Sequence, residues 1–201
     1  MSMLNVRLFA VLSLMPACVS AEQTPQPTQP FLASAVPDPR QVLVVDTQAL
    51  ESSDAPIVFS ATVTSFDQQP IESRLYIDYG SFSHGPAGPP FVASLPGSTL
   101  GAGPPGATSG TITAEWFPNM VQVDPGCHTA TLMVSHQFDD GPGGLGCPTC
   151  DSDSSAITWQ VLRCDSAVGN CSELPLEACE ALTNSCARVR GDAGAEDCPG
   201  P

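Results

Sequence analysis

Positive charge is what this sequence lacks most. It contains no lysine, and six arginines face 21 aspartates and glutamates, which gives a formal net charge of −15 at pH 7. Nucleic acids and anionic membrane surfaces are bound through basic side chains that replace counterions. The charge balance therefore argues against nucleic acid as a partner and against electrostatic binding to an anionic bilayer.

Histidine and long apolar runs are also scarce. The three histidines are His84, His128 and His136, and the chain contains neither an HExxH nor a Gly-x-Ser-x-Gly motif. These absences leave a metalloprotease or a serine hydrolase without a sequence anchor, so we expect no catalytic activity and no cofactor. His128 and His136 fall on one predicted strand about 27 Å apart, too far to share a ligand, and are expected at the rim of the core. After residue 17 no apolar run approaches the about 20 residues that span a bilayer.

The first 17 residues have the pattern of a secretory signal peptide. Arg7 provides the basic start, residues 8–15 carry no charge, and Ala17 is the small residue before a cleavage point. The apolar stretch of about eight residues is too short to cross a membrane. The sequence therefore predicts export of the chain.

Residues 14–18, Leu-Met-Pro-Ala-Cys, resemble the lipobox of bacterial lipoproteins. The resemblance implies that Cys18 is acylated, by palmitate among other fatty acids, and becomes the first mature residue in the cell envelope. Val19 in the next position is similar to an outer-membrane sorting signal. Cysteine parity agrees, because removing Cys18 from nine cysteines leaves an even eight in an oxidising compartment. An ordinary signal with a cysteine near its cleavage point is the alternative.

Residues 18–40 are rich in proline and lack apolar periodicity, which predicts a semi-extended tether. Beyond them, apolar residues alternate with polar ones in several short segments, which is typical of strands with one buried face. Residues 91–95 interrupt a proline- and glycine-rich stretch and are expected to form a short edge strand. The alternating apolar positions are Ile57, Phe59, Ala61 and Val63; Leu75, Ile77 and Tyr79; and Ile112, Ala114 and Trp116.

Two ten-residue segments, 127–136 and 155–164, are expected to form the last antiparallel hairpin. Facing Cys127 with Cys164 makes every paired residue number sum to 291, so that Leu132 meets Trp159. The pairs Ala130–Val161, Leu132–Trp159 and Val134–Ile157 then share one face and both cysteines lie on the other, whereas a slip of one residue would turn one apolar set outward. This register predicts a Cys127–Cys164 disulfide, which requires Cα atoms within about 6.8 Å.

Short strands joined by long loops predict an all-β protein, an antiparallel sandwich that resembles the immunoglobulin and fibronectin type over residues 41–165. Residues 166–201 are expected to be a cysteine-rich tail that is too short for a core of its own. Two disulfides would stabilise this tail, and its four cysteines allow three pairings. The tail cysteines are Cys171, Cys179, Cys186 and Cys198.

The loop of the last hairpin holds two motifs that suggest chemistry. Cys147 and Cys150 have the spacing of a redox pair, but they follow a glycine-rich loop rather than begin a helix, which favours a structural disulfide. Aspartates in the same loop offer oxygens for Ca²⁺, but they lack the glycine and glutamate of a calcium loop, so solvated carboxylates are the preferred interpretation and no metal site is predicted. These aspartates are Asp139, Asp140, Asp151 and Asp153.

Taken together, these features predict a noncatalytic, lipid-anchored envelope protein at the outer membrane. Its sandwich would present the 80–106 and 137–154 loops to an envelope protein or a glycan. The alternative function is an extracytoplasmic thiol–disulfide or metal-handling protein that uses Cys147 and Cys150.

Overall fold

A computed structural model describes residues 29–46, 55–80, 89, 91–103, 108–118, 121, 123–140 and 146–164. Within these ranges the chain forms eight β-strands and one 3₁₀ turn (η1), and no helix is long and apolar enough to cross a bilayer. The elements are β1 (Phe31–Val36), β2 (Leu43–Asp46), β3 (Ile57–Ser65), β4 (Glu72–Ile77), β5 (Ala93–Pro96), β6 (Thr108–Trp116), β7 (Gly126–Ser135), η1 (Asp151–Asp153) and β8 (Ser154–Cys164).

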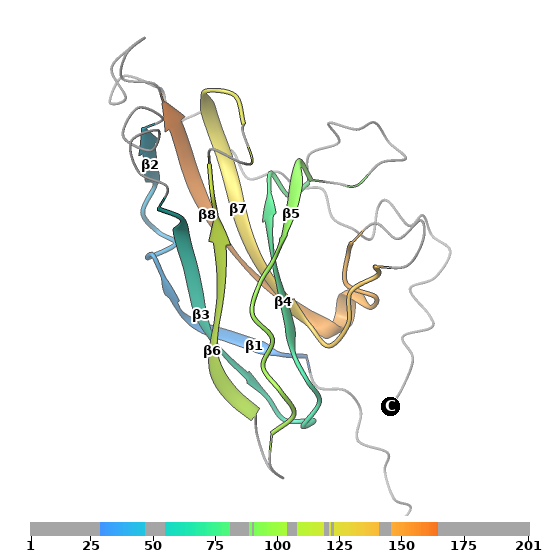
Figure 1. Ribbon diagram of the computed structural model, residues 1–201. Helices are drawn as coiled ribbons and strands as arrows, with labels where there is room; N and C mark the ends of the chain where they lie inside the picture. Colours follow the sequence, from blue (N-terminus) through green and yellow to red (C-terminus); the bar gives the residue numbers. More distant parts are fainter. Residues whose placement is uncertain are drawn as a thin grey trace, which may run out of the picture.

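The strands form two sheets, as Figure 1 shows. One sheet has three strands in the order β1-β3-β6, and the other has five in the order β2-β8-β7-β4-β5. Neighbouring strands are antiparallel except β2 and β8, which are parallel. The prediction of an all-β protein is confirmed.

The core lies between the sheets and is built from the predicted alternation. Phe59, Ala61 and Val63 point inward from β3, and every second residue of β4, β6, β7 and β8 joins them. The rings of Phe59 and Trp159 lie 4.9 Å apart between centroids, which joins the two sheets directly. Burial of these side chains, at roughly 25 cal/mol per Å² of apolar surface, is the main stabilising contribution.

The register predicted for the last hairpin is wrong by two residues. Cys127 faces Leu162 and Ala130 faces Trp159, so the paired numbers sum to 289 rather than 291. A slip of two residues keeps every side chain on its face, so the apolar pattern could not distinguish the two registers. Cys127 and Cys164 therefore do not face each other directly. The predicted disulfide between them is no longer supported by the register and stays a prediction.

The N-terminal part of the sandwich begins earlier than predicted. β1 lies inside the segment expected to be a tether, and it pairs with β3, whereas β2 pairs with β8 in the other sheet. The chain therefore changes sheets between Val36, whose peptide bond to Pro37 is cis, and Leu43. The indole Nε1 of Trp159 donates to the Pro37 carbonyl at 2.6 Å, which fixes this crossing to the core.

The predicted edge strand at residues 91–95 is present as β5, shifted by two residues to Ala93–Pro96. After β5 the chain passes to the other sheet. Gly97 forms a bridge with Ala114 of β6, and the Ser98 amide donates to the Thr113 carbonyl at 2.7 Å. This segment links the two sheets along one edge of the sandwich.

Several predictions concern residues outside the described ranges. They include the signal peptide (1–17), the acylated Cys18, the start of the tether, His84, and the tail (166–201) with Cys171, Cys179, Cys186 and Cys198. These stay predictions.

Candidate functional site

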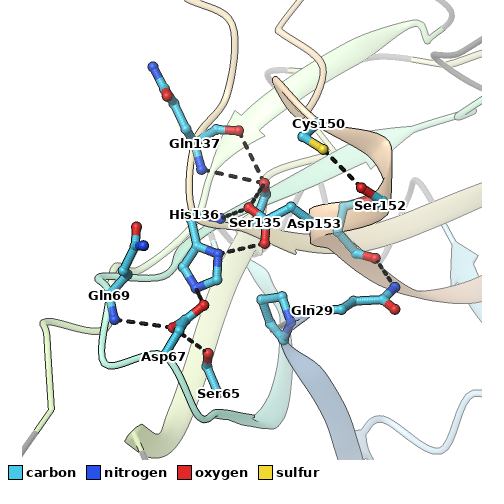
Figure 2. Close-up of polar contacts among 12 residues, drawn as sticks. Gln29, Ser65, Asp67, Gln69, Ser135, His136, Gln137, Cys150, Ser152 and Asp153 are labelled. Carbon is cyan, nitrogen blue, oxygen red and sulfur yellow. Dashed lines mark hydrogen bonds and ion pairs between the residues drawn. The ribbon is translucent and has the colours of Figure 1, made fainter. Parts of the chain in front are cut away.

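The most polar cluster of the described residues surrounds His136, just after β7. Figure 2 shows the imidazole between two carboxylates, Asp67 from the β3–β4 turn and Asp153 from η1. His136 Nδ1 lies 2.6 Å from Asp153 Oδ1, and Nε2 lies 3.1 Å from Asp67 Oδ2. The His136 and Asp67 side chains are 7% and 2% exposed, so the cluster is shielded from water.

A serine hydroxyl and two backbone amides complete this cluster. The Asp67 carboxylate accepts hydrogen bonds from Ser65 Oγ at 2.7 Å and from the Gln69 amide at 3.2 Å. The Asp153 carboxylate accepts one from the His136 amide at 3.2 Å. Three segments that are distant in sequence are thus joined at one end of the sandwich.

A second histidine is held in the same way at the other end of β7. His128 Nδ1 lies 2.8 Å from Asp78 Oδ2, and Nε2 lies 2.6 Å from the Asp124 carbonyl oxygen. Asp78 also accepts from the Thr129 amide at 2.9 Å and has a positive φ of 53°. The two histidines bind separate partners, as the distance predicted from the sequence requires.

The surroundings of both rings favour the charged imidazolium. Burial lowers the pKa of His136, but its hydrogen bond to Asp153 and the charges of Asp153 and Asp67 outweigh burial, so its pKa is raised above 6.5. Burial likewise lowers the pKa of His128, but the bonds to Asp78 and to the Asp124 carbonyl raise it more. In each ring both nitrogens lie close to oxygen atoms, an arrangement that suits the imidazolium because it carries a proton on both nitrogens.

This arrangement fits a structural role better than a catalytic one. A general base needs a ring nitrogen directed at the substrate, and in both rings the two nitrogens already face oxygen atoms of the protein. The His136 ring also lies between the two carboxylates. Within the described part of the chain, no three histidine, cysteine, aspartate or glutamate side chains are grouped so that they could hold a metal ion. Of the predicted acidic loop, Asp153 binds His136, and Asp140 forms an ion pair with Arg74.

A second apolar cluster lies on the outer face of the five-stranded sheet. It brings together residues of the two loops that were expected to bind a partner, 80–106 and 137–154. Its centre is Tyr76 of β4, whose ring lies 4.9 Å from Phe91 and 6.5 Å from Phe138 between centroids. The Tyr76 hydroxyl donates to the Gly146 carbonyl at 2.5 Å, and the Arg74 guanidinium lies 4.7 Å from the centre of the Phe138 ring. The described parts of both loops therefore pack against β4 instead of extending freely.

The predicted redox pair lies in this same region. Cys147 is fully buried within the Tyr76 cluster, and Cys150 is 7% exposed. Both are disulfide-bonded, as are Cys127 and Cys164. The partner of each cysteine stays a prediction.

Asp67 and Asp78 are the residues of these clusters that sequence reasoning missed. Each follows the end of a strand, and each meets its histidine across at least 50 residues of chain. No motif links positions so distant. The sequence offered only one signal, a carboxylate after the end of a strand.

Comparisons with known proteins give little to add. No family model and no curated protein matches the chain. Among solved structures, AggA, the major subunit of aggregative adherence fimbriae type I from Escherichia coli, matches 68% of this chain and 97% of its own, at 15% identity and a TM-score of 0.33. A TM-score this low does not establish a common fold, and no conclusion is drawn from it.

Proposed function

We propose that this chain is a noncatalytic lipoprotein of the bacterial envelope, anchored through Cys18 at the outer membrane. In this proposal an immunoglobulin-like sandwich is presented for binding to an envelope protein or a glycan, or for a structural role. The lipobox-like residues before Cys18 and the odd number of cysteines support the anchor.

The observation that carries the proposal is the position of β1. Only residues 19–30 separate Cys18 from Phe31, where the sandwich begins. A domain joined so closely to an N-terminal cysteine suits attachment to a surface. The occupied histidine nitrogens favour a noncatalytic role, because they leave no base for catalysis in the described site.

The strand order supports the immunoglobulin-like assignment. The N-terminal segment contributes β1 to the three-stranded sheet and β2 to the five-stranded sheet. The five-stranded sheet also contains the last two strands, β7 and β8, together with β4 and β5. Aligned packing of two such sheets is typical of immunoglobulin-like domains. The burial of Cys147 and Cys150 argues against the thiol–disulfide alternative, and Cys147, the first cysteine of the pair, does not begin a helix.

The test of the anchor is Cys18→Ser in the full-length chain. The native protein should be labelled by radioactive palmitate and enter the detergent phase of a Triton X-114 extraction, whereas the variant should lose the label and stay in the aqueous phase. Equal partitioning of both proteins would contradict the proposal. A matched control, Ser20→Ala, should behave like the native chain.

A further inference from the structure

Two exposed aromatic side chains lie at one corner of the three-stranded sheet. Phe31 and Phe66 are 65% and 62% exposed. Phe31 faces Thr64 across the β1–β3 pair, and Phe66 follows two residues later, just past the end of β3. Since Leu32 packs into the core, Phe31 lies on the outer face of the sheet, next to the end of β3 that Phe66 follows.

This corner is also where the N-terminal chain enters the sandwich. The Gln29 side-chain amide donates to the Ser154 carbonyl, and Ser155 Oγ donates to the Pro30 carbonyl. Figure 2 shows Gln29 at the same end as the His136 cluster. Phe31 therefore comes directly after the residues that fix the entry of the chain.

The sequence before this point is short. Ten residues, 19–28, lie between Cys18 and Gln29. Ten residues span about 31 Å as a polyproline II helix, at most about 36 Å when fully extended, and about 16–19 Å root mean square as a flexible coil. A lipid at Cys18 would hold this corner within a few nanometres of the bilayer surface.

The charges at this end do not provide a membrane contact by themselves. Asp67 and Asp153 form ion pairs with His136, whose single positive charge can offset only one of the two carboxylates. With no lysine in the chain, attraction to anionic lipids does not provide the binding, whereas aromatic side chains gain free energy at the boundary of headgroups and acyl chains.

We propose that Phe31 and Phe66 insert into the interfacial region of the bilayer and orient the sandwich with this end toward the membrane. This inference rests on the proposed lipid anchor. The partner is a lipid surface with zwitterionic headgroups. The opposite end, with His128 and Asp78, then points away from the bilayer.

The test uses the acylated full-length mature protein in phosphatidylcholine vesicles whose acyl chains are brominated or unmodified. Three variants, Phe31→Trp, Phe66→Trp and Val58→Trp, each add one fluorophore, and the emission of the wild-type protein, with its fully buried Trp116 and Trp159, is subtracted. Val58 is the matched control, because it is 46% exposed on the same face but faces Glu115, about 27 Å along β3 from Phe66.

Brominated lipid should quench the added emission of Phe31→Trp and Phe66→Trp and leave that of Val58→Trp unchanged. Co-flotation with the vesicles, measured on the same samples, separates the two proposals. Flotation without quenching, or with equal quenching in all three variants, overturns the membrane contact and leaves the anchor standing. Failure to float overturns the anchor and the contact with it.

Discussion

At each end of β7, one histidine contacts segments that lie far apart in the sequence. His136 contacts carboxylates from the β3–β4 turn and from η1, and His128 contacts Asp78 after β4 and the Asp124 carbonyl. Because each ring nitrogen lies close to an oxygen atom, the charged imidazolium, which carries a proton on both nitrogens, suits these contacts best. The protonation of two side chains is thereby coupled to the stability of the fold.

The stability of the protein should therefore fall as the pH rises above about 6.5. The pKa of both histidines is raised in the folded state, so their contribution is complete below the unfolded value and is lost as the pH passes the folded one. Thermal unfolding from pH 5 to pH 9 measures this directly, as a decrease in Tm over the upper part of the range.

The variant His136→Gln tests the assignment of this pH dependence. With one of two histidines removed, it should show about half of the native decrease in Tm. A native Tm that stays constant or rises between pH 6.5 and 9 would contradict the prediction, as would a variant with the full native slope.

The sequence placed His128 correctly on a strand, whereas His136 lies one residue past the end of β7. The two histidines contact separate partners, as the predicted distance between them requires. The sequence did not identify these partners. Asp153 was assigned to an acidic loop and Asp67 was not considered, since contacts across loops depend on how the loops fold.

Among the elements, the segment after β5 approaches the backbone of β4 closely. The Gly97 amide donates to the Ser73 carbonyl at 2.9 Å where the chain passes between the sheets. A Cβ atom at Gly97 would lie 2.3 Å from Ser73 Oγ and 2.9 Å from the Ser73 carbonyl oxygen. Real Cβ atoms do not approach backbone this closely, so a side chain here must displace β4 or β5.

Gly97→Ala should lower the free energy of unfolding by about 1–3 kcal/mol, the usual cost of overpacking. Gly101→Ala is the matched control, because a Cβ atom there meets nothing within 4 Å and the change should stay within about 0.5 kcal/mol. Urea titrations of the three proteins measure both values. Equal stability of the two variants would show that this crossing tolerates a side chain.

Strand positions were predictable because alternation with a period of two marks a half-buried strand. The register of the β7–β8 hairpin was not, because a slip of two residues preserves the same alternation. The structure pairs the large Trp159 with the small Ala130, a fit of volumes that the apolar pattern does not encode. β1 escaped prediction because the prolines around it resemble those of a linker.

For the whole molecule, the disulfide-bonded cysteines are the main covalent constraint. Cys127, Cys147, Cys150 and Cys164 are all bonded, and Cys147 lies within a packed cluster. Buried disulfides resist reduction because a thiolate must reach the sulfur atom to attack it.

We expect the mature protein to contain no thiol that reacts with iodoacetamide in the absence of a reductant. Under increasing dithiothreitol, Cys147 and Cys150 should not be alkylated before the other cysteines, as peptide mass spectrometry would show. Alkylation of this pair well before the others would instead favour the redox alternative.

The all-β class followed from the sequence, whereas the arrangement of the loops did not. The contact of Tyr76 with Phe91 and Phe138 joins three segments spread over more than 60 residues. Loops of this length were expected to extend toward a partner. Aromatic side chains in them found apolar surface on the outside of the sheet, and only the folded structure reveals that surface.

The division of the N-terminal chain between two sheets also has a mechanical consequence. Tension transmitted from an anchor would enter at Phe31 and act along β1, where the hydrogen bonds to β3 are loaded together in shear rather than opened one after another. If β1 yields, the parallel β2–β8 pair takes the load next. Resistance to forced unfolding is a property of rates, and two strand pairs loaded in series would slow detachment of the domain from a pulled tether.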